Sequence, residues 1–311
     1  AEAALPEGER MDFVAIVTPN HMHFPPAKMA LEHGFHVLSD KPATFNLAEA
    51  KELGALVEQS GLLYGLTHNY TGYPMVRQAK AMVMDGLLGD IRLVQVEYVQ
   101  GGRAKGGPGR KAWKEDPARG GPSLVMGDIG THAHNLLRFI TGLEVAEVAA
   151  DVGTIVPDRI THDYAGAMLR MSNGARGSFW VTQAAAGVEN GLRIRVSGAL
   201  GTLEWAQEHP QQLLFKPLDA PAQIRTPRGP GTLPLALRSS RIAAGHPEGY
   251  HEALANLYAD AAEAIAARRS GQAVDPLALH FPNEHDGWMG LQFVDAMLRS
   301  SQADGAWTRA S

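Results

Sequence analysis

The sequence predicts an α/β protein in which a parallel sheet with helical crossovers, over residues 1–70, precedes an α+β domain, over residues 71–311, with an open, mostly antiparallel sheet. Two observations lead to this fold class. Apolar strand-like runs alternate with helical runs up to residue 70, which is the pattern of βαβ units. After residue 142, strand-like runs follow one another with short turns between them, which is typical of an antiparallel sheet.

The first half begins with a continuous apolar run over residues 13–17, which has the composition of a buried parallel strand. Pro25 and Pro26 then favour the start of a helix, and Gly34 suits its C-terminal end. Residues 35–38 form the next strand-like run. This segment therefore predicts strand, helix and strand in that order.

The second crossover has clear helix boundaries. Asn46, with Glu49 three residues later, resembles a capping box for a helix over residues 47–59. Gly61 suits the end of that helix, because glycine adopts the left-handed conformation without steric cost. The strand-like run 62–66 follows and completes a βαβαβ unit.

Beyond residue 70 a different pattern begins. Alternating apolar and polar residues over 91–99 predict a half-buried strand, and residues 101–121 form a glycine-rich basic loop. Ser172-Asn173-Gly174 is a hairpin turn sequence. The remaining expected elements are helices over 74–88, 128–141, 250–269 and 287–300 and strands over 145–156, 165–171, 177–183, 192–196, 201–205 and 213–215.

Composition narrows the class of function. The 311 residues are 45% hydrophobic and 20% charged, which is globular composition, and the net charge of -5 argues against nucleic-acid and membrane partners. No apolar run approaches the about 18 residues of a membrane span, and the acidic residues 1–10 do not resemble a secretory signal. With no cysteine, thiol chemistry is excluded. We expect a cytoplasmic protein with a small-molecule ligand.

Two short runs carry the chemistry. Asp40-Lys41-Pro42 follows the carboxyl end of a strand, and Asp128 and His132 lie four residues apart on one face of an expected helix. Oxidation of a secondary alcohol requires a base for the hydroxyl proton, and His132 is suited because the ordinary pKa of histidine lies near neutrality.

Lys41 can stabilise negative charge on the same oxygen, and its charge is expected to depress the pKa of His132. Asp128 can accept a hydrogen bond from the substrate or from the imidazole, and at a helix start its charge is favourable. Lys41, Asp128 and His132 are therefore the expected catalytic residues.

Several short motifs occur in the order in which they occur in the Gfo/Idh/MocA family of NAD(P)-dependent sugar and polyol dehydrogenases. They are Val14 to Asn20 with His23, Asp40-Lys41-Pro42, Trp113-Lys114, Gly120-Gly121, Asp128 with His132, Gly198 to Trp205 and Asp286-Gly287. The chain resembles this family over nearly its whole length. Asp40 stands where Glu is usual and Lys114 where Arg is common, and both keep the charge.

The resemblance implies NAD or NADP as cofactor and a sugar, inositol or related polyol as substrate. The cofactor-binding residues it implies are Thr18, Pro19, Asn20, His23, Asp40, Lys41, Pro42, Asn69 and Trp113. The expected substrate-binding residues are Lys41, Tyr70, Lys114, Asp128, His132, Gln183 and Tyr250.

Members of this family open with a strand and a G-x-G-x-x-G turn whose backbone approaches the cofactor pyrophosphate. No such turn precedes Phe13. The resemblance thus implies an incomplete, Rossmann-like dinucleotide-binding domain, and we expect weak dinucleotide binding or none.

Each feature also has an alternative interpretation. A Lys-Pro turn is usually solvated, an Asp and a His four residues apart are often a surface pair, and a basic loop is usually mobile. In that loop, we expect every basic side chain except that of Lys114 to be solvated. The basic residues are Arg103, Lys105, Arg110, Lys111 and Lys114. The order of the motifs favours function for the other sites.

Two rival functions remain open. A metal-dependent hydrolase is motivated by His21-Met22-His23 and His132-Ala133-His134, although imidazoles two residues apart on a helix point in different directions, and we expect no metal. A noncatalytic binding or assembly module, with an impaired cofactor half, is the other rival.

The strand over residues 177–183 predicts assembly. Phe179 and Val181 lie on one face and Trp180 on the other, so both faces carry large apolar side chains. Helices of the carboxyl half can cover only one face. We therefore expect a homodimer or homotetramer packed through the open sheet.

Overall fold

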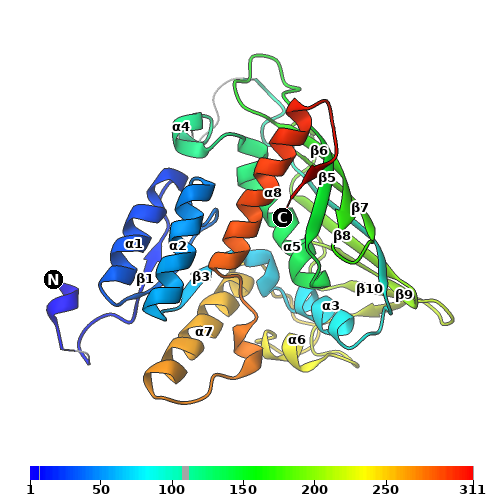
Figure 1. Cartoon of the computed structure of the whole chain (residues 1–311). Helices are drawn as coiled ribbons and strands as arrows, with labels where there is room; N and C mark the ends of the chain where they lie inside the picture. The colour runs from blue at the N-terminus through cyan, green and yellow to red at the C-terminus, as the bar shows by residue number, and fades with distance from the viewer. Residues whose placement is uncertain (7, 107–111, 311) are drawn as a thin grey trace.

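The computed structural model describes residues 1–6, 8–106 and 112–310, and its strands form two sheets (Figure 1). The smaller sheet is parallel and has the order β1, β2, β3. Its strands and crossover helices are β1 (Phe13–Ile16), α1 (Phe24–Glu32), β2 (His36–Ser39), α2 (Leu47–Ser60) and β3 (Tyr64–Leu66). The expected βαβαβ unit is confirmed, with β3 shorter than predicted.

Local interactions set the ends of α2. The Asn46 side chain accepts a hydrogen bond from the Glu49 N–H at 3.0 Å, and the Glu49 carboxylate accepts one from the Phe45 N–H at 2.9 Å. Gly61 ends the helix in the left-handed conformation, with φ of 64°. The contact of Asn46 and the position of Gly61 agree with the prediction, but the capping box is only half formed, because Glu49 binds the N–H of Phe45, which precedes the N-cap residue Asn46.

The larger sheet has nine strands in the order β11, β10, β9, β8, β4, β7, β6, β5, β12. The sheet is mixed, because β4 and β7 pair in parallel whereas all the other neighbouring strands of this sheet pair antiparallel. The strands are β4 (Ile91–Val99), β5 (Val145–Gly153), β6 (Tyr164–Met171), β7 (Arg176–Thr182), β8 (Gly191–Gly198), β9 (Gly201–Ala206), β10 (Leu213–Pro217), β11 (Gln223–Arg225) and β12 (Thr308–Arg309). The short β11 and β12 were not predicted.

Helices cover one face of this sheet (Figure 1). Helix α8 (Glu284–Gln302) packs on β5, and α5 (Thr131–Thr141) packs on β4 and β8. The remaining helices and helical turns are η1 (Glu2–Ala4), η2 (Asn20–Met22), η3 (Asn69–Gly72), α3 (Pro74–Met84), η4 (Ala112–Lys114), α4 (Pro117–Gly120), η5 (Met126–Gly130), α6 (Pro234–Arg238), α7 (Tyr250–Arg269) and η6 (Pro276–Leu279). None of the described helices is both long and apolar enough for a membrane span.

Three helix predictions need correction. The helix expected over 128–141 is divided, because η5 is a π-helical turn that contains Asp128 while His132 lies in α5. Helix α3 ends before residue 88, since Gly86 has φ of 73°. Helix α8 begins three residues earlier than expected, because Asn283 and Asp286 form a capping box.

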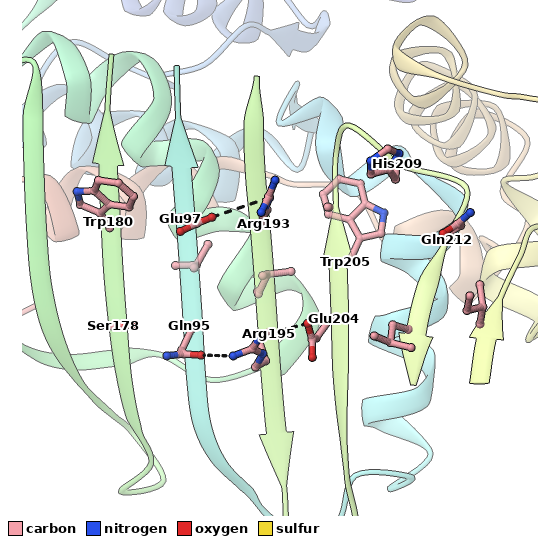
Figure 2. A pocket seen from close by; sticks show the side chains of 15 residues that line it. Gln95, Glu97, Ser178, Trp180, Arg193, Arg195, Glu204, Trp205, His209 and Gln212 are labelled. Carbon is pink, nitrogen blue, oxygen red and sulfur yellow. Dashed lines mark hydrogen bonds and ion pairs between the residues drawn. The ribbon is translucent and has the colours of Figure 1, made fainter. Parts of the chain in front are cut away.

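The other face of the large sheet, the open face, carries the side chains that line a pocket (Figure 2). Phe179 and Val181 are buried whereas Trp180 is 42% exposed, which confirms the predicted division of faces along β7. Beside Trp180 the open face carries Glu97, which lies 3.9 Å from Arg193. Further along the same face, Arg195 pairs with Glu204 at 3.2 Å. The expectation of a generally apolar second face is therefore too simple, because charged and aromatic side chains alternate on it.

Candidate active site

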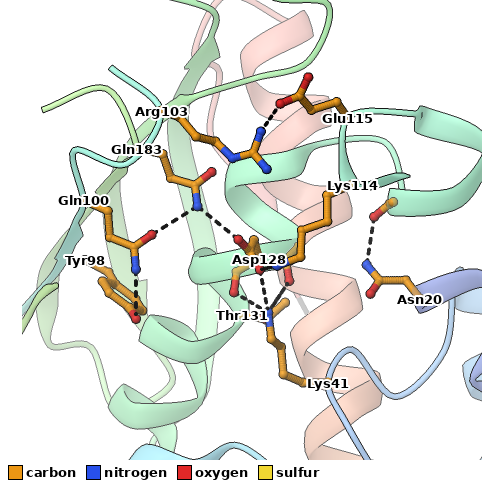
Figure 3. Close-up of polar contacts among 12 residues, drawn as sticks. Asn20, Lys41, Tyr98, Gln100, Arg103, Lys114, Glu115, Asp128, Thr131 and Gln183 are labelled. Carbon is orange, nitrogen blue, oxygen red and sulfur yellow. Dashed lines mark hydrogen bonds and ion pairs between the residues drawn. The ribbon is translucent and has the colours of Figure 1, made fainter. Parts of the chain in front are cut away.

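Lys41 and Asp128 meet where the loop after β2 contacts the π-helical turn η5 (Figure 3). The Lys41 Nζ donates to the carbonyl oxygens of Gly127, at 3.3 Å, and of Asp128, and it lies 3.3 Å from Asp128 Oδ1. These contacts join the smaller sheet to the helical layer of the larger sheet. Two of the three predicted catalytic residues are thus in direct contact.

Asp128 also binds a second lysine and an amide (Figure 3). The Lys114 Nζ donates to Oδ1, and the Gln183 Nε2 donates to Oδ2 at 3.0 Å. Burial opposes ionisation of Asp128, but the charges of Lys41 and Lys114 outweigh burial and hold the pKa of this carboxyl below its ordinary value. Asp128 is therefore a carboxylate that places two ammonium groups side by side.

Asp128 was expected to accept a hydrogen bond from the substrate or from the imidazole of His132, and the structure does not show the second of these contacts. Its carboxylate oxygens are engaged by Lys41, Lys114 and Gln183, and the imidazole of His132 has another partner. That partner is His68, whose Nδ1 lies 3.2 Å from His132 Nδ1. The sequence did not indicate this contact, since nothing local points to a partner 64 positions away.

The surroundings of His132 keep it neutral near pH 7. Burial lowers its pKa well below the ordinary value, the charge of Lys41 lowers it further, and Asp128 opposes both effects. The expected effect of Lys41 on this histidine is confirmed in direction. Lys41 itself has a lowered pKa, because burial outweighs the stabilising charge of Asp128. The site thus combines a neutral imidazole with a lysine whose amine binds its proton less strongly than a solvated lysine does.

A hydrogen-bonded series of side chains continues from Gln183 (Figure 3). The Gln183 Nε2 donates to Gln100 Oε1 at 3.1 Å, and Gln100 Nε2 donates to Asn190 Oδ1 at 2.7 Å. Asn190 Oδ1 also accepts from the Tyr98 hydroxyl at 2.8 Å, and that hydroxyl contacts the one of Tyr70. The sequence did not predict Tyr98, Gln100 and Asn190 as residues of the site. Only the alternation along β4 indicated that Tyr98 faces the interior.

Two buried polar atoms of the site have no hydrogen-bond partner among the residues that the structure describes. They are Asn69 Nδ2 and Gln183 Oε1, and both side chains are 3% exposed. An unpartnered buried polar atom is costly, so such atoms are expected where a ligand completes the hydrogen bonds. These residues therefore fit a bound polar group, such as a cofactor or a hydroxylated substrate.

The other predicted cofactor residues lie mainly in the loops after β1 and β2. Thr18, Pro19 and Asn20 follow β1, and the Asn20 Nδ2 donates to the carbonyl oxygen of Gly120 at 2.9 Å. Asp40 follows β2 beside Lys41 and Pro42, and its Oδ1 accepts from Thr67 at 2.5 Å. The carboxyl ends of these parallel strands thus place the predicted residues at one edge of the sheet.

His23 does not line an open site. It is 1% exposed, and its two ring nitrogens contact the carbonyl oxygens of Pro42, at 2.5 Å, and Thr18, at 2.8 Å. The side chain therefore connects the loops after β1 and β2 from inside.

The remaining predicted residues lie around the lysine pair. Trp113 is half-buried in η4, with the Lys114 Nζ 5.9 Å from its ring centroid. Tyr250 begins α7, is half-exposed and has its ring centroid 6.4 Å from that of Tyr70. In the basic loop, Arg103 pairs with Glu115, whereas Arg110 and Lys111 lie outside the described residues.

The histidine pairs that motivated a metal-dependent hydrolase are separated. His134 is buried and stacks on Phe293, with ring centroids 4.3 Å apart, whereas His132 contacts His68. Within residues 1–6, 8–106 and 112–310, no group of three or more histidine, aspartate or glutamate side chains is arranged to hold a metal.

Two family models match the chain in sequence. Residues 2–68 match the model described as oxidoreductase family, NAD-binding Rossmann fold, and residues 76–204 match the GFO/IDH/MocA C-terminal domain. A curated relative, the uncharacterised oxidoreductase YfiI of Bacillus subtilis, is 33% identical over 97% of this chain and 79% of its own length.

Solved structures agree with these matches. An oxidoreductase from Sinorhizobium meliloti is 45% identical with a TM-score of 0.88, over 98% of this chain and 81% of that one. An inositol dehydrogenase homologue from Azotobacter vinelandii, in complex with NADH and myo-inositol, is 34% identical with a TM-score of 0.88, over 99% of this chain and 80% of that one.

Proposed function

Since the chain belongs to the GFO/IDH/MocA family of NAD-binding oxidoreductases, we propose that it oxidises a secondary alcohol of a sugar, inositol or related polyol. The observation that carries this proposal is the contact of Lys41 with Asp128 beside a neutral, buried His132. A neutral imidazole can accept a proton, and an ammonium group can stabilise the oxygen that loses it. Alcohol oxidation needs both functions at the hydroxyl oxygen, while the hydride leaves the attached carbon.

NAD or NADP, when bound, supplies the acceptor for the hydride that leaves the alcohol carbon. Thr18, Pro19, Asn20 and Asn69 are the residues that we assign to holding it, together with the loop at Asp40. Asn69 supports this assignment because its buried Nδ2 has no partner among the described residues.

We assign to His132 the role of accepting the hydroxyl proton and to Lys41 the role of stabilising the alcohol oxygen. As the hydroxyl proton moves to the imidazole, negative charge develops on the alcohol oxygen, and the Lys41 Nζ stabilises that charge. Asp128 holds Lys41 by its charge and by its carbonyl oxygen. In this mechanism Asp128 is a positioning residue, because its carboxylate oxygens are already engaged by Lys41, Lys114 and Gln183.

A polyhydroxylated substrate suits the polar side chains of the site. Lys114 and Gln183 present hydrogen-bonding groups beside Asp128, and the unpartnered Gln183 Oε1 can accept from a hydroxyl. A site with such groups selects against ligands that lack hydroxyls, because its buried polar atoms then stay unsatisfied. Tyr70 and Tyr250 are assigned to the same ligand, and myo-inositol bound to the A. vinelandii relative supports this substrate class.

The test compares His132→Ala and Lys41→Ala with the unmodified chain, using NAD+ or NADP+ and a panel of sugars and inositols. Each substitution is expected to lower kcat by about 10²- to 10⁴-fold, the range for acid-base groups, with smaller effects on cofactor affinity. Exposed residues of the same types provide controls, His33→Ala and Lys51→Ala. Near-normal turnover in both site variants would contradict the mechanism.

We also propose that the open face of the large sheet packs against a second copy of the chain. Trp180 and Met168, 42% and 64% exposed, lie on neighbouring strands of this sheet. Large exposed apolar side chains on a sheet favour burial in an assembly. The charged pairs beside Trp180 would then fix the register of the two copies.

A further inference from the structure

His68 and His132 form a direct contact between two imidazoles. Their Nδ1 atoms are 3.2 Å apart, and the rings meet edge to face with centroids 5.0 Å apart. His68 is 3% exposed and follows β3. Its backbone is held independently of the imidazole, because its carbonyl oxygen accepts from the N–H and the hydroxyl of Thr71 at 3.1 and 2.9 Å.

A contact between two ring nitrogens needs one hydrogen between them. A neutral imidazole has one N–H and one unprotonated nitrogen, so one histidine must donate and the other accept. Both rings are neutral near pH 7, because burial and then Lys41 lower the pKa of each, that of His68 to about 3. The direction of this hydrogen bond therefore decides which nitrogen of His132 remains unprotonated.

We propose that His68 is a positioning residue that accepts a hydrogen bond from Nδ1–H of His132 and thereby leaves His132 Nε2 free to take the proton of the substrate hydroxyl. This inference rests on the proposed function of His132 as a base. In the opposite arrangement, with His68 as donor, the hydrogen of His132 is on Nε2, and no proton can be accepted there.

The same hydrogen bond stabilises the product of proton transfer. Once Nε2 takes the hydroxyl proton, His132 is an imidazolium, and its Nδ1–H bond to His68 becomes charge-assisted. His68 accepts this bond without gaining a charge. The charged and titratable groups that act on the pair are Lys41, Lys114, Asp128, His134 and Arg138, and the hydroxyl-bearing rings beside it are Tyr70 and Tyr98.

The first test does not require activity. Nitrogen NMR of the chain with ¹⁵N-labelled imidazoles distinguishes the two neutral tautomers. His36 is an internal reference, because its Nδ1 accepts a hydrogen bond from the Leu63 N–H at 2.8 Å and its hydrogen must be on Nε2. His132 is expected to show the opposite tautomer, with the hydrogen on Nδ1.

Two substitutions identify the cause of that tautomer. His68→Phe keeps a ring but removes the acceptor, so His132 is expected to lose its preference for Nδ1–H, while the His36 signals stay unchanged. His68→Gln offers an acceptor oxygen and is expected to retain the preference at least in part. A hydrogen on His132 Nε2 in the unmodified chain, or an unchanged Nδ1–H tautomer in His68→Phe, would overturn the inference.

Kinetics give the second test. His68→Phe is expected to lower kcat about ten- to hundred-fold, the effect of losing one hydrogen bond to a charged group, while KM changes little. Because the lost bond stabilised the imidazolium, the pKa of His132 falls and the acid limb of the kcat profile moves to lower pH. A reduced kcat with an unmoved acid limb would indicate a purely structural role. Inactivity of the unmodified chain on every polyol would instead count against the proposed function, and the NMR result would still decide the role of His68.

Discussion

Replacing Asp128 with asparagine measures how much the negative charge at the centre of the site contributes to stability. The substitution keeps the size of the side chain and removes the one carboxylate that contacts both Lys41 and Lys114. The side chains of the three residues are between 17% and 21% exposed, so solvent screens them only in part. Two ammonium groups would then lie close together without the carboxylate that bridges them.

The expected cost follows from this burial. Removing one partner of a buried ion pair costs about 3–5 kcal/mol, and partial exposure places Asp128→Asn at the lower end, about 3 kcal/mol in the free energy of unfolding. The lysines hold the folded-state pKa of Asp128 below its unfolded value of about 3.9. Its contribution is therefore fully present above about pH 4 and is lost as the pH falls through the folded-state pKa.

Urea unfolding at pH 7 and at pH 3 measures this difference. The matched control is Asp295→Asn, because Asp295 pairs with Arg299 at 2.7 Å but the two side chains are 45% and 52% exposed. That control is expected to cost less than about 0.5 kcal/mol. A cost below about 1 kcal/mol for Asp128→Asn at pH 7, or a cost that grows as the pH falls, would refute the reasoning.

A further prediction concerns assembly. The chain is expected to sediment as a dimer or tetramer at micromolar concentration, and Trp180→Asp is expected to shift it to monomer, because this substitution buries a charge in the contact. Met29→Asp, at an exposed methionine of α1, is the control. A stable monomer formed by the unmodified chain would refute the proposal.

The sequence determined the elements whose boundaries depend on neighbouring residues. Asn46, Glu49 and Gly61 set the ends of α2 by contacts within a few positions, and the alternation over 91–99 matched β4. Tyr250–Arg269 was likewise predicted with its observed bounds. Local hydrogen bonds and side-chain periodicity suffice for such elements, because both are properties of the chain segment itself.

The sequence also identified Lys41, Asp128 and His132, through motifs in a known order. It did not identify their partners. Lys114 was expected to contact substrate, and in the structure it donates to Asp128. The orientation of each of these side chains is set by such partners, which approach from other parts of the chain.

Only the tertiary structure decided the long-range pairings. Strand β4 lies between β7 and β8, parallel to the first and antiparallel to the second, and no local pattern specifies those neighbours. The contact of His68 with His132 spans 64 positions, and it exists because the end of β3 and the start of α5 pack at the same place. Such contacts depend on how buried surfaces fit together, and periodicity along one segment carries no information about the surface that it meets.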